Sequence, residues 1–377
     1  MRTRVKHDRI VEIDALRGTA MLLVCVAHFF TVYFPPKGIP WVVLMQRSFM
    51  VASPTFILVS GLMLGFLYKS QLPEFASIRL KLVDRAVFLI TVGHILIMIA
   101  RAALPGGFNT AIHRVFITDA IGFSIIAGSF LITRTSTQTR FLLSVMLYVA
   151  SWIMTLFFHP SFTLLRGIHD ALFGTFMDEG PYLVGFYLVP WFSFYLLGSC
   201  LGEVLSDKMN SRRRLAAWIL RTALVFTGLA VAIKGAYMFL HRFGVIPHSE
   251  WAYSLTSLFQ KYPPGPVYFL FYGGIGMFVL FLLLQFGRVR IAKSYVSWAS
   301  VLGRTSLITF IIQYYVYWVF LSSVHLYTRF WLFPLLGSVV FIYVLSYLWL
   351  RKDLNGFLTV GLYKGYAAHA AGHKYLR

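Results

Sequence analysis

Three ionisable residues, Asp14, Arg17 and His28, occur in or just before the first long apolar run, residues 16–34. Arg17 and His28 are eleven positions apart, about 1100° of helical rotation and so about 20° from three full turns, and Asp14 precedes Arg17 by one turn. In a helix the three side chains would therefore share one stripe about 21 Å long. A neutral imidazole in such a stripe could act as a general base, and a guanidinium group could bind phosphate oxygens.

A structural interpretation is open for part of this stripe. Asp14 and Arg17 could form an i,i+3 pair that only stabilises the end of a helix. That pair does not explain His28, which lies well past the middle of the run, although a membrane histidine can also be a packed, hydrogen-bonded group. Asp14 lies too far along the helix axis to contact His28, so we expect it to orient Arg17 instead.

Further polar residues interrupt later apolar runs. Arg304 opens the ninth run, and Gln313 lies nine positions beyond it, about two and a half turns, so the two do not share a narrow stripe. Asp119, in the fourth run, either pairs with an arginine such as Arg114 or lines a cavity, and the sequence leaves both open. His94, in the third run, is interpreted as a packed structural residue.

Two proline-containing segments would shape the helix bundle. Ser53 and Pro54 begin the second run, where proline frees backbone groups and can border a cavity, or simply kinks the helix. Lys261 precedes prolines 263, 264 and 266 before the eighth run, which fixes an extended entry or simply separates two helices. The residues expected to support or line a cavity are Asp14, Ser53, Pro54, Asp119, Lys261 and Gln313.

The composition indicates which kind of structural element must position these residues. Of the 377 residues, 58% are hydrophobic and only 12% are charged, and the mean hydropathy is +0.73. The apolar runs are continuous and do not alternate, which predicts membrane-spanning helices and excludes a membrane barrel. Neither Cys25 nor Cys200 has the neighbours of a metal site, and we expect no metal.

The apolar runs predict an all-α, polytopic membrane bundle of about ten transmembrane helices. The expected spans are 16–34, 49–68, 82–104, 115–133, 141–158, 182–205, 215–240, 267–286, 296–324 and 330–350. The ninth is long enough to tilt or break, and the less apolar segment 159–181 could hold an interfacial helix. A single membrane domain would fill residues 1–377, and no cleavable signal peptide is expected because no small-residue cleavage site follows the first run.

The distribution of basic residues predicts the orientation. Of the 34 lysines and arginines, 23 fall in the loops and ends on one side of the predicted membrane, and eight fall on the other. The positive-inside rule places the richer side in the cytoplasm, together with residues 1–13 and the basic tail 351–377. This placement also accounts for the net charge of +21, so nucleic acid is not an expected partner; the lipid bilayer is.

Several short motifs resemble those of the transmembrane acyltransferase superfamily, and more closely the bacterial relatives of the heparan-α-glucosaminide N-acetyltransferase catalytic domain. They occur in the expected order along nearly the whole chain. They are residues 9–18 followed by His28, 52–61, 118–122, 190–202, 261–264 and 302–307. The chain departs from the pattern at Gln313, where relatives often have histidine, and at Gly265, where they have serine.

The resemblance implies a multi-pass enzyme of the cell membrane. It would transfer an acyl group, most simply acetyl, from cytoplasmic acyl-CoA to a hydroxyl or amine of an extracytoplasmic acceptor, for which a sugar is one candidate. His28 would be the catalytic base or an acyl carrier, because no histidine lies between His28 and His94, and Arg17 and Arg304 would bind the CoA phosphates. The alternative is a transporter or channel for a small polar or lipid-linked molecule, with the same groups lining its pathway.

Overall fold

The computed structural model describes residues 10–34, 39–103, 107–112, 114–175, 185–247, 249–287, 289–323 and 330–364. Within these ranges every named element is a helix, and the one β-bridge joins Lys261 to Pro264. The all-α prediction is therefore confirmed. Residues 1–9 of the expected N-terminal stretch and residues 365–377 of the expected tail lie outside the described part of the chain.

Among the described residues, ten helices are fourteen residues or longer. They are α1 (Val11–Tyr33), α3 (Ala52–Ser70), α4 (Phe75–Phe88), α7 (Ile117–Leu131), α8 (Thr137–Phe157), α10 (Leu188–Lys208), α11 (Arg212–Arg242), α13 (Pro266–Phe286), α14 (Arg290–Arg304) and α16 (Leu332–Arg351). The shorter α-helices are α2 (Pro40–Ser48), α5 (His94–Ala102), α6 (Gly107–Ile112), α9 (Thr163–Leu172), α12 (Glu250–Thr256) and α15 (Ser306–Tyr314). Tighter or wider helical turns extend several of them, namely η1 (Phe49–Val51), η2 (Leu72–Glu74), η3 (Leu89–Gly93), η4 (Tyr315–Phe320), η5 (Leu321–Ser323) and η7 (Leu354–Phe357).

Eight continuous helical segments in the described residues are long and apolar enough to cross a membrane. The number becomes nine if α14 and the helix that follows it, which meet at a bend of 73°, count as one broken span. The break expected in the ninth run is thus found at Thr305. The remaining expected span, 115–133, corresponds to α7, which at about 22 Å is shorter than a bilayer core of about 30 Å. Its packing against α3, α4 and α10 stabilises this short helix inside the protein.

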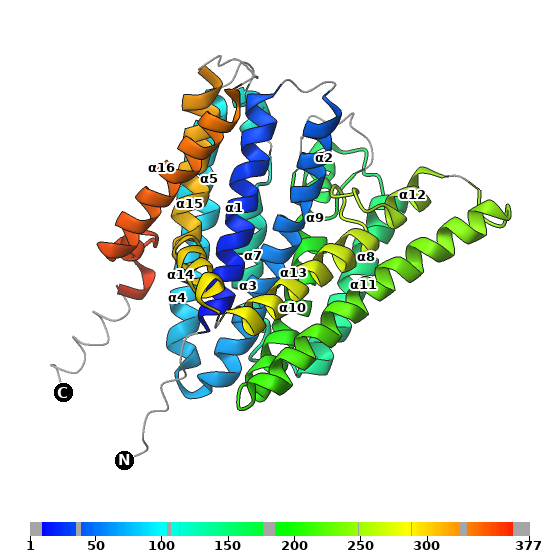
Figure 1. Ribbon diagram of the computed structural model, residues 1–377. Helices are drawn as coiled ribbons and strands as arrows, with labels where there is room; N and C mark the ends of the chain where they lie inside the picture. The colour runs from blue at the N-terminus through cyan, green and yellow to red at the C-terminus, as the bar shows by residue number, and fades with distance from the viewer. Residues whose placement is uncertain are drawn as a thin grey trace, which may run out of the picture.

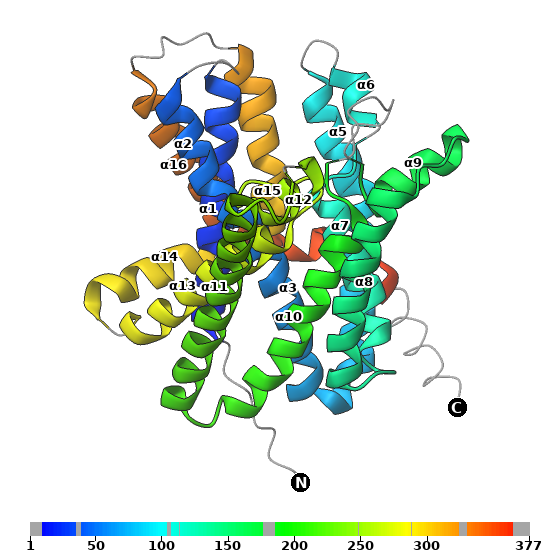
Figure 2. The same ribbon diagram turned by 90° about the vertical axis from the view of Figure 1, so that its right-hand side faces the viewer.

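The bundle is built around the pair α3 and α10, with α1 against α14 and α11 against α13 as further close pairs (Figure 1). Figure 2 shows α1 and α14 on one side of the molecule and α7 and α8 on the other. The beginning of α1 and the end of α16 lie at the same end of the bundle, which we call the base. There Arg212, at the start of α11, donates to Glu12 at 2.7 Å.

Glycines allow the central helices to touch. A Cβ on Gly61 or Gly65 of α3 would lie 2.0 or 1.9 Å from a backbone oxygen of α10, and one on Gly198 or Gly202 of α10 would lie 2.3 or 2.0 Å from a backbone oxygen of α3. Such reciprocal spacing of small residues lets two membrane helices approach until their backbones are in contact. The pair therefore forms a dense centre against which the other helices pack.

Candidate functional site

A cavity of about 660 Å³ lies in the base half of the bundle. Its walls come from α1, α3, α4, α7, the junction of α14 with α15, and the segment that follows α16. The charged lining residues are Asp14, Arg17, Arg85, Arg304 and Asp353. Three of these side chains, on Arg85, Arg304 and Asp353, are exposed, so the cavity reaches the surface beside them. Three guanidinium groups and two carboxylates give it a cationic balance.

One face of α1 runs along this cavity. Asp14, Arg17, Met21 and Val24 all line it, at the spacing of successive helical turns. His28 lies one turn beyond Val24 on the same face, but it is not among the lining residues. The predicted stripe therefore exists as a continuous helix face, of which the cavity occupies the part nearer the base.

The bend between α14 and α15 brings a second element to Arg17. Its guanidinium Nη2 donates to the Ser306 hydroxyl at 2.9 Å, at the first residue of α15. The guanidinium also lies over the ring of Phe56, 5.6 Å from its centroid. Arg304 is the last residue of α14 and lines the same cavity, so the two arginines proposed from the sequence face one space.

Two glycines permit this approach of α14 to α1. A Cβ on Gly18 would lie 1.8 Å from the backbone oxygen of Ala299, and one on Gly303 would lie 1.8 Å from the backbone oxygen of Asp14. Both distances are far inside van der Waals contact, so the crossing requires glycine at both positions. The crossing fixes Arg304 opposite the face of α1 that carries Arg17.

His28 is held by α15 and η4. Its Nδ1 lies 3.2 Å from Oε1 of Gln313. Its ring packs edge-on against Trp318, Tyr314 and Phe310, with centroid separations of 4.8, 5.3 and 6.4 Å. Phe310 also lines the cavity, so one ring that packs against the histidine forms part of the cavity wall. The imidazole therefore faces the interior of the bundle.

Gln313 itself is fully buried. Its Oε1 contacts His28, and its amide Nε2 has no hydrogen-bond partner among the described residues. The spacing in the sequence predicts that Gln313 and Arg304 do not share a helix face. In the structure the bend places them on different helices, α15 and α14. Gln313 meets His28 and does not line the cavity.

Asp119 pairs with His94. Its Oδ2 lies 2.9 Å from Nδ1 of His94 and accepts the backbone N–H of Phe116 at 2.7 Å, which caps α7. Asp119 does not line this cavity, and its described ion-pair partner is His94 and not Arg114. The pair connects α5 to the start of α7.

The remaining predicted residues lie away from this cavity. Ser53 and Pro54 are buried in the first turn of α3, within the continuous helical segment Pro40–Ser70. Lys261 stands over the rings of Phe186 and Tyr262, 4.9 and 5.2 Å from their centroids, in the segment before α13. None of the three borders the cavity among the residues the structure describes.

Positive charges also lie on the other side of His28. The guanidinium of Arg101 stands over the Trp318 ring, 5.4 Å from its centroid. Arg101, Arg114 and Lys261 are all close enough to act electrostatically on the histidine. The sequence singles out Lys261 as a candidate cavity residue and Arg114 as a possible partner of Asp119, whereas Arg101 resembles an ordinary loop charge there.

The last described segment closes one wall of the cavity. Asp353, Asn355 and Leu358 line it. Both carboxylate oxygens of the buried Asp84 on α4 accept backbone N–H groups of this segment, from Val360 at 2.8 Å and from Tyr363 at 3.1 Å. This wall could not be predicted from the sequence, in which residues 351–377 resemble a basic tail.

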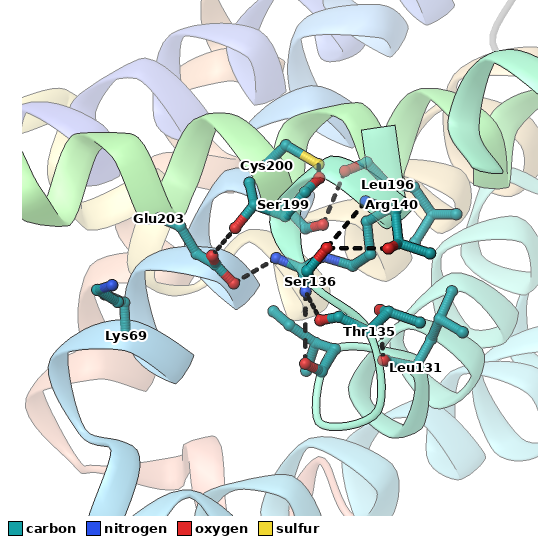
Figure 3. A network of polar contacts seen from close by, with 12 residues as sticks. Lys69, Leu131, Thr135, Ser136, Arg140, Leu196, Ser199, Cys200 and Glu203 are labelled. Carbon is teal, nitrogen blue, oxygen red and sulfur yellow. Dashed lines mark hydrogen bonds and ion pairs between the residues drawn. The ribbon is translucent and has the colours of Figure 1, made fainter. Parts of the chain in front are cut away.

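A second buried charge pair supports the far side of the bundle. Arg140 of α8 donates to Glu203 of α10, which also accepts from the Thr137 hydroxyl, and Arg140 donates to the Thr135 carbonyl at 2.9 Å (Figure 3). Arg140 is 1% exposed. In the sequence Arg140 falls among the basic residues of a predicted loop, although the acid Glu203 inside an apolar run is a signal for a buried partner. The pair lines no part of the cavity and joins α8 to α10.

No group of three or more His, Cys, Asp or Glu side chains with the geometry of a metal site occurs in the described residues. A family model described as "Heparan-alpha-glucosaminide N-acetyltransferase, catalytic" matches residues 9–238. The match includes Asp14, Arg17 and His28 and ends before Arg304 and Gln313. No curated protein matches the chain.

Proposed function

Because the chain belongs to the heparan-alpha-glucosaminide N-acetyltransferase catalytic family, we propose that it is a membrane acyltransferase that uses acyl-CoA, acetyl-CoA in the simplest case. The donor binds in the cavity at the base of the bundle. The acceptor presents a hydroxyl or an amine from the opposite side of the membrane, and a carbohydrate is the acceptor class we favour. In this proposal the base faces the cytoplasm, as the basic loops predict, and the membrane is the cell membrane.

The observation that carries this proposal is the continuity of one face of α1. Asp14, Arg17, Met21 and Val24 border the cavity, and His28 is the next residue on that face. The rise from Arg17 to His28 is about 16 Å, a length that suits a pantetheine arm extended along the helix. A nucleotide held near Arg17 could thus place its thioester at the histidine.

The charges of the cavity suit the phosphates of CoA. Arg17 and Arg304 line one space from two different helices, and Arg85 adds a third guanidinium. Planar guanidinium groups bind phosphate oxygens in pairs of parallel hydrogen bonds. Arg17 is already oriented by Ser306, which leaves the exposed Arg304 as the more mobile of the two.

The proposed reaction needs one base and no prior activation of the donor, because a thioester is already reactive. His28 Nε2 accepts the proton of the acceptor hydroxyl or amine as that atom attacks the acyl carbon. The new C–O or C–N bond forms, the C–S bond breaks with its electron pair remaining on sulfur, and the proton passes to the CoA thiolate. The products are the acylated acceptor and free CoA.

The test uses the purified full-length protein in lipid nanodiscs with radiolabelled acetyl-CoA. Equilibrium binding of the label, and its transfer to glucosamine or, more slowly, to water, would support the proposal. A transporter or channel would bind or pass a solute without breaking the thioester. Absence of both acetyl-CoA binding and thioester cleavage by the folded protein would refute the acyltransferase function.

A further inference from the structure

The hydrogen bond between Gln313 and His28 has a defined donor and a defined acceptor. An amide oxygen can only accept a hydrogen bond, so the Nδ1 atom that faces Gln313 Oε1 at 3.2 Å must carry the proton. In a neutral imidazole the other nitrogen, Nε2, then holds the lone pair. Nε2 has no hydrogen-bond partner among the described residues, so it remains available to a substrate.

The surroundings of the pair keep the ring in this orientation. Gln313 is fully buried on α15, and the rings of Tyr314 and Trp318 pack edge-on against the imidazole. Rotation of the ring would break the contact with Gln313 and disturb both aromatic contacts. The arrangement therefore selects one tautomer and one orientation of His28.

The unpartnered amide nitrogen of Gln313 is a candidate hydrogen-bond donor to a ligand. It is buried and has no hydrogen-bond partner among the described residues. A buried N–H group without a partner is unfavourable, and a bound molecule that offers an oxygen there gains the full benefit of the hydrogen bond. The side chain would then connect the histidine to the substrate through the two ends of one amide.

We propose, on the basis of the acyl transfer proposed above, that Gln313 is the positioning residue of His28: its Oε1 holds the Nδ1–H tautomer so that Nε2 receives the acceptor proton, and its Nε2 donates to an oxygen of the bound substrate. The uncharged amide orients the ring without adding the carboxylate that stabilises the imidazolium in a hydrolase triad. Gln313 does not exchange a proton or form a bond with the acyl group. Its effect on the reaction passes through His28 and through the pose of the substrate.

The first experiment measures the tautomer directly and does not depend on activity. Nitrogen-15 NMR of the histidine-labelled protein distinguishes a protonated Nδ1 from a protonated Nε2, and the signal of His28 is assigned by its loss in His28→Ala. We expect Nδ1–H in the natural protein and a mixture of tautomers in Gln313→Met, which has a similar shape and no hydrogen bond. A protonated Nε2 in the natural protein, or an unchanged tautomer in Gln313→Met, would overturn the proposal.

The second experiment measures turnover of acetyl-CoA across pH. Gln313→Met should lower kcat by about ten- to a hundredfold, as expected when a base loses its orientation. Gln313→Glu keeps an acceptor for Nδ1–H and should recover part of kcat. Its carboxylate would stabilise the imidazolium, so the acidic limb of the pH profile should move to higher pH. A purely structural glutamine would change stability in these variants but would leave the acidic limb in place.

The control is Thr309→Val, one turn earlier on the same helix. The Thr309 hydroxyl is fully buried and bonds to Ser346 at 2.8 Å, so its loss should lower the melting temperature without shifting the pH profile. Failure of the natural protein to cleave acetyl-CoA would refute the proposed function, whereas the NMR result would still decide the contact. Normal cleavage with an unchanged kcat in Gln313→Met would refute only the role of Gln313.

Discussion

At the scale of single residues, the proposed site separates donor binding from chemistry. Arg17 and Arg304 line one cavity, while His28 is not among its lining residues and packs against Phe310, which is. Substitutions at the two places should therefore change different kinetic constants, because a group that binds the donor and a group that moves a proton act at different stages.

Replacing His28 with alanine should lower turnover of acetyl-CoA by about two to four powers of ten, the usual contribution of a general base. Binding of acetyl-CoA should persist, since the proposed phosphate-binding Arg17 lies about 16 Å away along α1. Turnover per folded molecule and melting temperature are measured together. The matched control is His241→Ala at the exposed end of α11, which should leave turnover unchanged. A stable His28→Ala protein with full activity would remove the histidine from the mechanism.

Replacing Arg304 with alanine should weaken binding of acetyl-CoA by roughly tenfold, because a charge-assisted hydrogen bond to phosphate is lost. Binding of S-acetylpantetheine, which lacks the nucleotide phosphates, should be unaffected. Arg290→Ala, at the other end of α14, tests whether loss of any exposed arginine has the same effect. Equal weakening of both ligands would show that Arg304 does not contact the phosphates.

At the scale of elements, close helix crossings position the site. The α1–α14 crossing places Arg304 opposite Arg17, and the α3–α10 crossing provides the support on which α1 and α7 pack. Each crossing depends on glycines, for which even one added carbon atom has no room.

Gly198→Ala should destabilise the protein by about 1–3 kcal/mol, the range for overpacking in a close-packed interior. The added Cβ would lie 2.3 Å from the backbone oxygen of Leu58, so α3 and α10 must separate. Gly337→Ala is the control, because a Cβ there meets nothing within 4 Å, and it should be neutral or mildly stabilising. Thermal unfolding in detergent measures both, and equal melting temperatures would contradict the crossing.

The segment that follows α16 should matter for donor binding. Asp84→Ala removes the acceptor for two backbone N–H groups of that segment, so the wall formed by Asp353, Asn355 and Leu358 should loosen. We expect KM for acetyl-CoA to rise severalfold with little change in kcat, and Asp84→Asn, which keeps one acceptor oxygen, to be intermediate. Limited proteolysis measures whether the segment after α16 has separated from α4. An undocked segment with an unchanged KM would show that this wall does not contact the donor.

At the scale of the whole molecule, the basic loops predict that the base of the bundle is cytoplasmic. Ser211 lies at the base before α11, and Val245, which is 65% exposed, lies beyond the other end of that helix. Both natural cysteines are buried, so an impermeant thiol reagent would report only an introduced cysteine. In intact cells Val245→Cys should react and Ser211→Cys should not. The opposite pattern would invert the topology and place the donor cavity outside the cell.

The sequence predicts the architecture well, because apolar runs are a local signal. It also predicts that Asp14, Arg17 and His28 share a helix face, since helical periodicity follows from spacing alone. It does not predict that Arg85 and Asp353 border the same cavity as Arg17, or that Asp119 forms an ion pair with His94. Those relations depend on how separate helices meet, and a partner on another helix has no fixed spacing in the chain.

The cavity has a consequence for how the protein is made. Its wall combines Ile10, at the start of the first helix, with Leu358, after the last one. During synthesis the first helix enters the membrane long before the residues that form the last wall leave the ribosome. A nascent chain would therefore have an incomplete cavity until nearly all of its helices are inserted. Under the proposed function, only a chain whose assembly is finished would bind the donor.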